Sequence, residues 1–225
     1  MSRKLLLEKV RHEQIVGVIR EDGVEVAEAV ADAYVKNGIR VLEVTLTTPD
    51  AFELMSRFAQ KYAPQQITIA AGTVRSSNDA ALARRAGAEV IVSPHTNAQV
   101  IEYANENDML CIAGAATCTE IIHAWETGAD IIKIYPAHYL GGPDYIRTIR
   151  GPIRGIPMLA GGPVPLDQID VYLDAGCIAV NLGPSLALPD LVRTAQWDEI
   201  GRRVTMAMSI VNGRRSMLEP ETYVH

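Results

Sequence analysis

The amino-acid sequence predicts a single-domain (β/α)8 barrel, the TIM barrel of the α/β class. Eight short apolar runs, rich in β-branched residues, alternate with helix-length amphipathic stretches along nearly the whole chain. Several of those stretches, such as VEVAEAVADAYVKNG, end in glycine, which commonly terminates helices. The chain has 225 residues, of which 48% are hydrophobic, and this suits one barrel core. We therefore expect eight parallel strands, each followed by a helix.

Each apolar run is predicted to be one strand. In chain order the runs are IVGVIR (15–20), VLEVTL (41–46), ITIAAG (67–72), VIVSP (90–94), MLCIAG (109–114), IIKIYP (131–136), IPMLAGG (156–162) and IAVNLG (178–183). A doubly wound open sheet is the alternative fold, and it usually carries a G-x-G-x-x-G turn after its first strand. Here the first run continues into Arg20, Glu21 and Asp22, which favours the barrel.

The two ends of the chain are predicted to lie outside the eight repeating units. Residues 1–14 are predicted to form an N-terminal helix that covers the bottom of the barrel. Apolar residues recur at helical spacing from Trp197 to Val211, which predicts a final docking helix. Residues 214–225 show no such pattern and are expected to form a flexible tail. Residues 1–225 are thus predicted to form one domain.

Composition and charge narrow the classes of partner. Twenty-one basic and 27 acidic residues give a net charge of −6, without a basic stripe, so nucleic acid is not expected to bind. Cys111, Cys118 and Cys177 form no C-x-x-C pair, which indicates buried thiols in a reducing compartment rather than a disulfide or zinc framework. The start of the sequence lacks the apolar block of a signal peptide, and no run approaches eighteen uncharged apolar residues. We expect a cytoplasmic protein that does not enter membranes.

Lys133 is the first candidate for chemistry, because catalytic groups of such barrels sit at the carboxyl ends of strands. Strand alternation places Ile131, Lys133 and Tyr135 on one face, with Ile132 and Ile134 on the other. One interpretation is a buried lysine stem whose amine reaches solvent at the strand end. The other is a lysine whose burial favours the neutral amine, the form that attacks a ketone.

Glu43 is the second candidate, in the middle of the predicted second strand. It shares a face with Val41 and Thr45, and a carboxylate in such a place needs a partner or a task. A structural salt bridge is one interpretation, and a general acid/base beside the lysine is the other. Schiff-base chemistry requires one group that shuttles protons, so the lysine and the glutamate together favour that chemistry.

The sequence resembles the 2-keto-3-deoxy-6-phosphogluconate (KDPG) aldolase and 4-hydroxy-2-oxoglutarate (KHG) aldolase family. The matching stretches include NGIRVLEVTLTTP, AGTV, AGAEVIVSPH and GADIIKIYPA, in that order and at barrel spacing, and they extend from about residue 15 to 188. The resemblance implies a class I aldolase that cleaves a 2-keto-3-deoxy sugar acid or 4-hydroxy-2-oxoglutarate to pyruvate and an aldehyde. It also implies a homotrimer with no metal or organic cofactor, and a small 2-keto acid as the substrate.

The resemblance implies a role for each matching residue. Lys133 would form the Schiff base, and Glu43 would be the acid/base, acting through a water. Thr73, with a nearby arginine, would hold the carboxylate of the pyruvyl half. The remaining residues would line the pocket (Pro94, Tyr135) or bind the distal end of the substrate, where phosphorylated members hold phosphate (Gly161, Gly162, Gly183, Ser185).

The sequence departs from the family pattern in three places. Some members have arginine at the position of Thr47, so we infer that Arg20 supplies the cation instead, although a salt bridge at the barrel rim is its other interpretation. The stretch AGAAT (113–117) lacks an expected proline. Pro163 follows the glycine pair, and Pro184 stands where a serine is expected, one place before Ser185. Because proline has no N–H, one interpretation is that the distal end prefers an unphosphorylated or shorter substrate. The other is that a shifted backbone lets Gly183 and Ser185 compensate for the missing donors.

Other functions would need other residues. A metal-dependent aldolase needs histidines and carboxylates around a divalent ion, and the five histidines here show no H-x-H or H-E-x-x-H spacing. Phosphate-binding barrels of nucleotide or thiamine metabolism share glycine-rich last loops but do not require Lys133 with Glu43. A non-catalytic barrel that binds a ketoacid, as a sensor or scaffold, stays open as an alternative.

Overall fold

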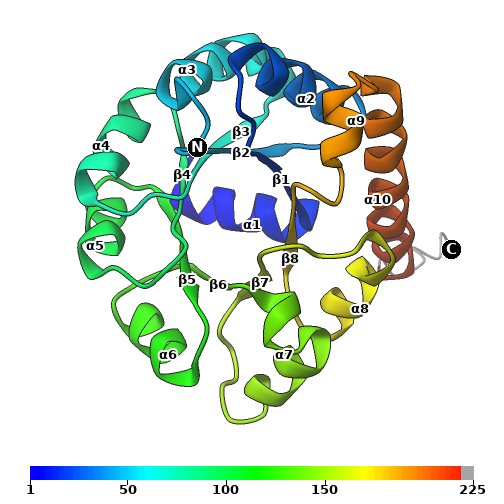
Figure 1. Ribbon diagram of the computed structural model, residues 1–225. Coiled ribbons are helices and arrows are strands. Elements are labelled where there is room, and N and C mark those ends of the chain that lie inside the picture. Colours follow the sequence, from blue (N-terminus) through cyan, green and yellow to red (C-terminus); the bar gives the residue numbers. More distant parts are fainter. Residues whose placement is uncertain (219–225) are drawn as a thin grey trace, which may run out of the picture.

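A computed structural model describes residues 1–218 of the chain and shows the predicted closed barrel. All neighbouring strands are parallel and follow one another in chain order around the ring (Figure 1). The strands are β1 (Ile15–Ile19), β2 (Val41–Thr45), β3 (Thr68–Gly72), β4 (Val90–Val92), β5 (Leu110–Ala115), β6 (Ile131–Ile134), β7 (Met158–Ala160) and β8 (Ala179–Leu182). Each lies within or overlaps its predicted run, so the predicted (β/α)8 fold is confirmed.

Helices surround the ring of strands, and α1 crosses it (Figure 1). They are α1 (Arg3–Glu13), α2 (Val24–Lys36), α3 (Ala51–Lys61), α4 (Ser77–Arg85), α5 (Ala98–Glu106), α6 (Cys118–Glu126), α7 (Gly142–Arg150), α8 (Ile169–Asp174), α9 (Pro189–Arg193) and α10 (Trp197–Leu218), with short 3-10 helices η1 (Ala63–Gln65), η2 (Ala137–Leu140) and η3 (Leu166–Gln168). The starts of α4 and α6 show how local sequence sets these bounds. Ser76 and Thr117 each form a capping box with the acidic residue three places later.

The apolar core has two parts, one inside the barrel and one between the strands and the surrounding helices. The inner part is filled from below by Leu6 and Val10 of α1, which are almost fully buried. They pack with inward-facing strand residues such as Val16, Val41 and Leu110. The lower end of the barrel is therefore closed by a helix, which confirms the prediction made for residues 1–14.

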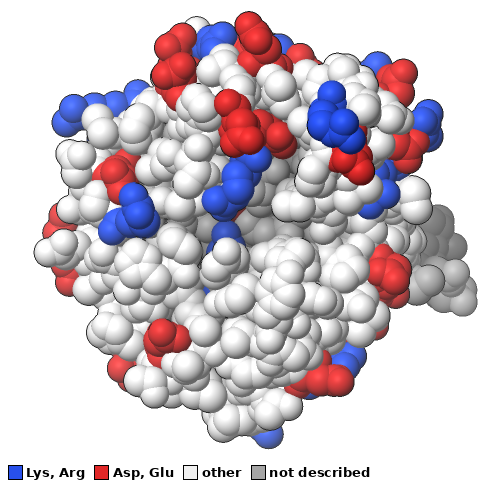
Figure 2. Space-filling view, viewed as in Figure 1, with Lys and Arg blue, Asp and Glu red and all other residues white. Residues whose placement is uncertain are grey.

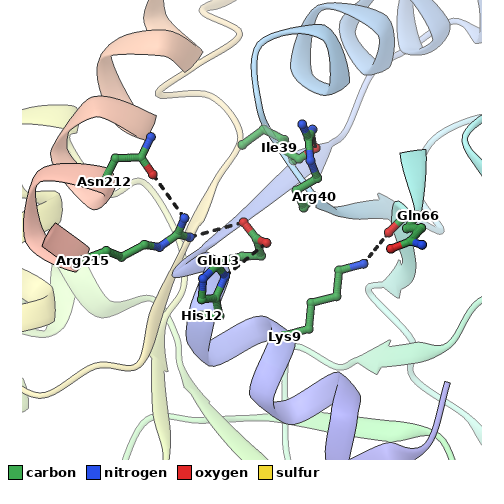
Figure 3. Close-up of polar contacts among 8 residues, drawn as sticks. All are labelled: Lys9, His12, Glu13, Ile39, Arg40, Gln66, Asn212 and Arg215. Carbon is green, nitrogen blue, oxygen red and sulfur yellow. Dashed lines mark hydrogen bonds and ion pairs between the residues drawn. The ribbon is translucent and has the colours of Figure 1, made fainter. Parts of the chain in front are cut away.

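Polar contacts fix α1 beneath the strands. Nε of Arg3 donates to Oδ1 of Asp130 at 2.6 Å, just before β6. In Figure 3, Lys9 reaches the backbone carbonyl of Gln66, while Glu13 accepts a hydrogen bond from Arg215 of α10 at 3.3 Å. The first and last helices of the chain are thus joined directly.

The start of the predicted tail needs correction. Residues 214–225 were expected to be irregular, but α10 continues to Leu218, and residues 219–225 lie outside the described part of the chain. The extra turn has its own ion pairs, because Arg214 contacts Asp174 at 2.7 Å and Arg215 contacts Glu13 at 3.3 Å. Contacts with distant parts of the chain, which the local pattern does not reveal, prolong the helix.

Charged side chains are unevenly distributed on the face of the molecule shown in Figure 2. On the face shown in Figure 2 they gather toward the rim, whereas basic side chains also lie near the centre, over the barrel, beside a recess. Within the described range 1–218, none of the helices is both long enough and apolar enough to cross a membrane.

Candidate active site

Lys133 and Glu43 meet inside the barrel, from strands on opposite sides of the ring. Lys133 of β6 is 7% exposed, and Glu43 of β2 is fully buried. The Lys133 Nζ lies 3.6 Å from Oε1 of Glu43. Two opposite charges so close together in a dry place compensate each other, because either one alone would be costly to bury. The two predicted catalytic residues are therefore adjacent in space.

Strand alternation explains why both side chains point inward. Ile131 belongs to the inner core, whereas Ile132 and Ile134 belong to the outer one, so Lys133 points into the barrel as predicted. On β2, Val41 is likewise an inner residue, and Glu43 is two places further along. Lys133 is the last residue but one of β6, and Glu43 is at the centre of β2, two residues before the carboxyl end of that strand.

Two glycines make room for these side chains. A Cβ atom added at Gly72 would lie 2.3 Å from Oε1 of Glu43, and one added at Gly161 would lie 2.6 Å from Cε of Lys133. Any larger residue at either place would displace the lysine or the glutamate. This use of glycine gives no signal in a single sequence, so Gly72 was not among the predicted site residues.

Gly161 was expected to offer its N–H to the distal end of the substrate, and this expectation is wrong. Its N–H donates to the Ile134 carbonyl at 2.9 Å, because the β6–β7 ladder continues one residue past β7. Its place in the site is instead beneath the side chain of Lys133. The neighbouring Gly162, with φ of +104°, allows the chain to turn out of the barrel.

Arg20 lies at the mouth of the barrel between two threonines. Its Nη1 donates to Oγ1 of Thr47 at 3.2 Å, and its Nη2 donates to Oγ1 of Thr73 at 3.3 Å. Thr73 has a φ of +61°, which is rare for a β-branched residue and typical of functional sites. The predicted pair of Arg20 and Thr73 is thus brought together, with Thr47 on the other side of the guanidinium.

Tyr135 and Pro94 lie next to the lysine. The ring centroid of Tyr135 is 5.7 Å from Nζ of Lys133, close enough for a cation–π contact. The backbone of Pro94 packs against Gly114, which leaves no space there for a Cβ atom. Gly114 is in register with Lys133 across the β5–β6 ladder, so Pro94 borders the same part of the pocket.

The loops after β7 and β8 are tied to each other. The hydroxyl of Ser185 donates to the carbonyl of Val164, and the Arg203 guanidinium donates to the Ser185 carbonyl at 2.8 Å. The carbonyl of Gly183 accepts from two backbone N–H groups of the turn that follows it. Gly183 and Ser185 therefore lie in this pair of joined loops, where the Ser185 hydroxyl is already engaged.

A buried asparagine was missed by the sequence analysis. Asn181 of β8 is nearly fully buried, and its Nδ2 donates a short hydrogen bond to Oε2 of Glu43. It follows Ala179, an inner residue, by two places, so alternation points it into the barrel. Alternation was therefore the available signal. An uncharged residue in an apolar run is less conspicuous than a charged one such as Lys133 or Glu43.

Glu21 and Asp22 place negative charge beside Arg20. Burial, together with the neighbouring Asp22 carboxylate, raises the pKa of Glu21 to about 7. Both residues line a cavity of about 610 Å³ that also borders Arg20, Gly183 and Pro184. The mouth of the barrel between β8 and β1 is therefore not uniformly basic.

A metal centre would need several ligating side chains close together. Within residues 1–218, no three His, Cys, Asp or Glu side chains are grouped so that they could hold an ion. Two of the cysteines are buried, and burial raises the pKa of the Cys111 and Cys177 thiols to about 12. These two thiols are therefore protonated at neutral pH.

Comparison with known proteins places the whole barrel in one family. The family described as KDPG and KHG aldolase matches residues 6–203. The 2-dehydro-3-deoxy-phosphogluconate aldolase of Haemophilus influenzae is 30% identical over 206 residues, which are 92% of this chain and 96% of that protein. The 2-dehydro-3-deoxy-6-phosphogalactonate aldolase of Escherichia coli is also 30% identical, over 81% of this chain and 89% of its own.

Among solved structures, the KDPG aldolase of Legionella pneumophila has a TM-score of 0.82 at 22% identity, covering 92% of this chain and 98% of that one. At that identity the likeness supports the fold, while the sequence matches above establish the family. The protein is therefore a member of the KDPG and KHG aldolase family, a family of retro-aldol lyases.

Proposed function

We propose that the protein is a class I, pyruvate-dependent aldolase whose Schiff-base lysine is Lys133. The observation that carries the proposal is the buried contact of 3.6 Å between Nζ of Lys133 and Oε1 of Glu43. A nucleophilic amine and a proton-transferring carboxyl group are the two groups that such a reaction requires. The Legionella relative, in whose structure pyruvate is captured as a covalent carbinolamine, supports the same chemistry.

The residues suit each step of the cleavage. The Lys133 amine adds to the C2 carbonyl, and the carbinolamine then loses water to give the protonated imine. Glu43 removes the proton of the C4 hydroxyl, and the C3–C4 bond breaks as its electrons move toward the imine nitrogen. The aldehyde leaves, C3 of the resulting enamine takes a proton, and water releases pyruvate. Glu43 acts here through a water, and the reaction uses no metal or organic cofactor.

Arg20 and Thr73 are proposed to hold the carboxylate of the substrate. A guanidinium can bind a carboxylate through two parallel hydrogen bonds, and the two terminal nitrogens of Arg20 donate to threonine hydroxyls at the mouth. Pro94 and Tyr135 are proposed to line the pyruvyl half of the pocket. These four residues would hold the substrate so that its C2 carbonyl faces the amine of Lys133.

The substrate is proposed to be a 2-keto-3-deoxy sugar acid or 4-hydroxy-2-oxoglutarate, without a phosphate group. Pro163 and Pro184 remove two N–H donors from the loops that would face the distal end. The Ser185 hydroxyl, the remaining side-chain donor there, already donates to the Val164 carbonyl. A phosphorylated ester remains the rival substrate, because the named relatives from H. influenzae and E. coli act on such esters.

Trapping with borohydride tests the proposal. Reduction of the wild-type protein in the presence of pyruvate should add one 1-carboxyethyl group per chain, formed by hydride reduction of the pyruvate imine and read by intact mass. Lys133→Met should abolish both the added mass and aldol cleavage, because it replaces the amine with an apolar group of similar length. Retention of a tenth of wild-type turnover by this variant would rule out the covalent mechanism.

The matched control is Lys61→Met, since Lys61 is an exposed lysine that pairs with Asp32 on the outer surface. It should be trapped as fully as the wild-type protein. A wild-type protein that binds pyruvate but is never trapped would support the alternative, a non-catalytic barrel that binds a ketoacid.

A further inference from the structure

We propose that Asn181 is a positioning residue that holds the Glu43 carboxylate in the orientation needed for proton transfer. This inference rests on the proposed function. Asn181 belongs to β8 and Glu43 to β2, with β1 between them, and the two residues are 138 positions apart in the sequence. Their side chains meet inside the barrel, where both are almost fully buried.

The direction of this hydrogen bond is set by chemistry. An ionised carboxylate can only accept hydrogen bonds, so the amide must turn its Nδ2 toward Oε2 of Glu43. Oε1 of the same carboxylate faces Nζ of Lys133 at 3.6 Å. The two oxygens of Glu43 are therefore divided between a fixed neutral donor and the reacting amine.

A neutral donor has a specific advantage at this place. An arginine or lysine there would form a second ion pair with Glu43 and compete with Lys133 for it. An amide instead holds one oxygen without adding charge, and it leaves the other oxygen free to exchange a proton. Without the amide, the carboxyl group could rotate about its terminal torsion, which is broad for glutamate.

The backbone of Asn181 is fixed within β8, while its side chain makes one hydrogen bond. Residue 181 is in register with Val16 across the β8–β1 ladder, and both neighbours in the chain, Val180 and Leu182, belong to the outer core. Its Oδ1 is buried and has no hydrogen-bond partner within residues 1–218. A buried amide that makes only one of its possible bonds costs stability, which argues for a role in the site rather than in the core.

Removing the amide tests the proposal. Asn181→Ala should lower kcat by about ten- to a hundredfold, the effect of losing one hydrogen bond to a charged group. KM for the ketoacid should change less than about threefold, because Arg20 and Thr73 bind the carboxylate. Trapping of pyruvate by borohydride should remain complete, since Lys133 is untouched.

A double-mutant cycle separates positioning from packing. In a Glu43→Gln background, which should retain roughly 10⁻² to 10⁻⁴ of kcat, Asn181→Ala should lower kcat no further than about twofold. An equal loss in both backgrounds, or a kcat in Asn181→Ala above half of the wild-type value, would overturn the proposal.

Two further variants guard against a trivial explanation. Asn181→Leu keeps the shape but has no donor, so it should lose as much kcat as Asn181→Ala; recovery of activity would show that only volume matters. Thr68→Ala is the control, because it removes another buried polar side chain, on β3, that is in register with Val41 and not with Glu43. It should leave kcat within about twofold. Failure of wild-type trapping would refute the proposed function itself, independently of Asn181.

Discussion

Lys133 and Glu43 form a buried pair of opposite charges, and this limits the substitutions that can test their roles without unfolding the protein. Their charges lie 3.6 Å apart where almost no solvent reaches. Removing one charge leaves the other without compensation, which in buried pairs is strongly destabilising. Substitutions that keep the shape, such as Lys133→Met and Glu43→Gln, therefore test chemistry best when the folded state is verified by circular dichroism.

Arg20 is the residue at which a conservative change should be informative. Arg20→Lys keeps the charge but loses the planar pair of donors that contacts Thr47 and Thr73, so KM for the ketoacid should rise about tenfold. The weakening should apply equally to the binding of pyruvate, measured by calorimetry. An unchanged affinity for pyruvate would show that another group holds its carboxylate. Arg75→Lys, which changes an exposed arginine in the loop between β3 and α4, serves as the control.

Glu21 makes stability depend on pH. Its pKa is raised to about 7 in the folded protein, chiefly by burial, against 4.5 ordinarily. The folded state therefore holds this proton more tightly than the unfolded state, and the resulting stability is full below pH 4.5 and lost as the pH rises through 7. Glu21→Gln should accordingly increase the free energy of unfolding at pH 8 by on the order of 1 kcal/mol, a value reduced for partial solvent screening.

Urea denaturation at pH 4.5 and pH 8 provides the measurement for Glu21. The difference between the variant and the wild-type protein should be near zero at the lower pH. A difference independent of pH would contradict the prediction. Glu25→Gln removes an exposed carboxylate from the first turn of α2, and it should not show the same dependence on pH.

At the scale of elements, the loops after β7 and β8 are predicted to set the choice of substrate. The value of kcat/KM for 2-keto-3-deoxygluconate should be at least comparable to that for its 6-phosphate. Pro163→Ala restores an N–H beside Gly162 and should raise kcat/KM for the phosphate ester about tenfold. Pro152→Ala, in an exposed turn between α7 and β7, should change neither value. A preference of more than about a hundredfold for the ester in the wild-type protein would refute the argument.

The sequence predicted the type and order of the elements well, and their ends less well. The run 90–94 contained β4, but the strand ends at Val92: the N–H of Ser93 still donates to the Ile112 carbonyl of β5 at 3.0 Å, whereas Pro94 has no N–H to continue the ladder. The run 109–114 fell one residue short, since β5 continues to Ala115 beside Ile134. Hydrophobic alternation reports which residues are buried, whereas the end of a strand depends on its neighbours in the sheet.

At the scale of the whole molecule, the site joins strands that are far apart in the sequence. Lys133 and Glu43 could be predicted because each is a charged residue within an apolar run. Alternation also points Asn181 inward, but an uncharged residue in an apolar run gives no sign that it contacts Glu43 from another strand. The space above Gly72 and Gly161 could not be predicted either, because it exists only between side chains from different strands.

The assembly of the molecule is also open to test. We expect a homotrimer, and large apolar side chains on the outer surface support association: Tyr139 and Met206 are 76% and 59% exposed and border one recess. Light scattering on purified protein should give three times the chain mass of 24.5 kDa. A mass equal to one chain at micromolar concentration would contradict this expectation.

The helix α1, which closes the lower end of the barrel, has a kinetic consequence. With Leu6 and Val10 packed beneath the inner core, the lower end of the barrel is closed, and substrate is expected to enter at the carboxyl ends of the strands. In the proposed mechanism, the half of the substrate that is bound to Lys133 lies deepest, and the aldehyde half lies between it and solvent. That mechanism therefore predicts ordered product release, with the aldehyde first and pyruvate last. In steady-state inhibition experiments, pyruvate should compete with the substrate, whereas the aldehyde should act as a noncompetitive inhibitor.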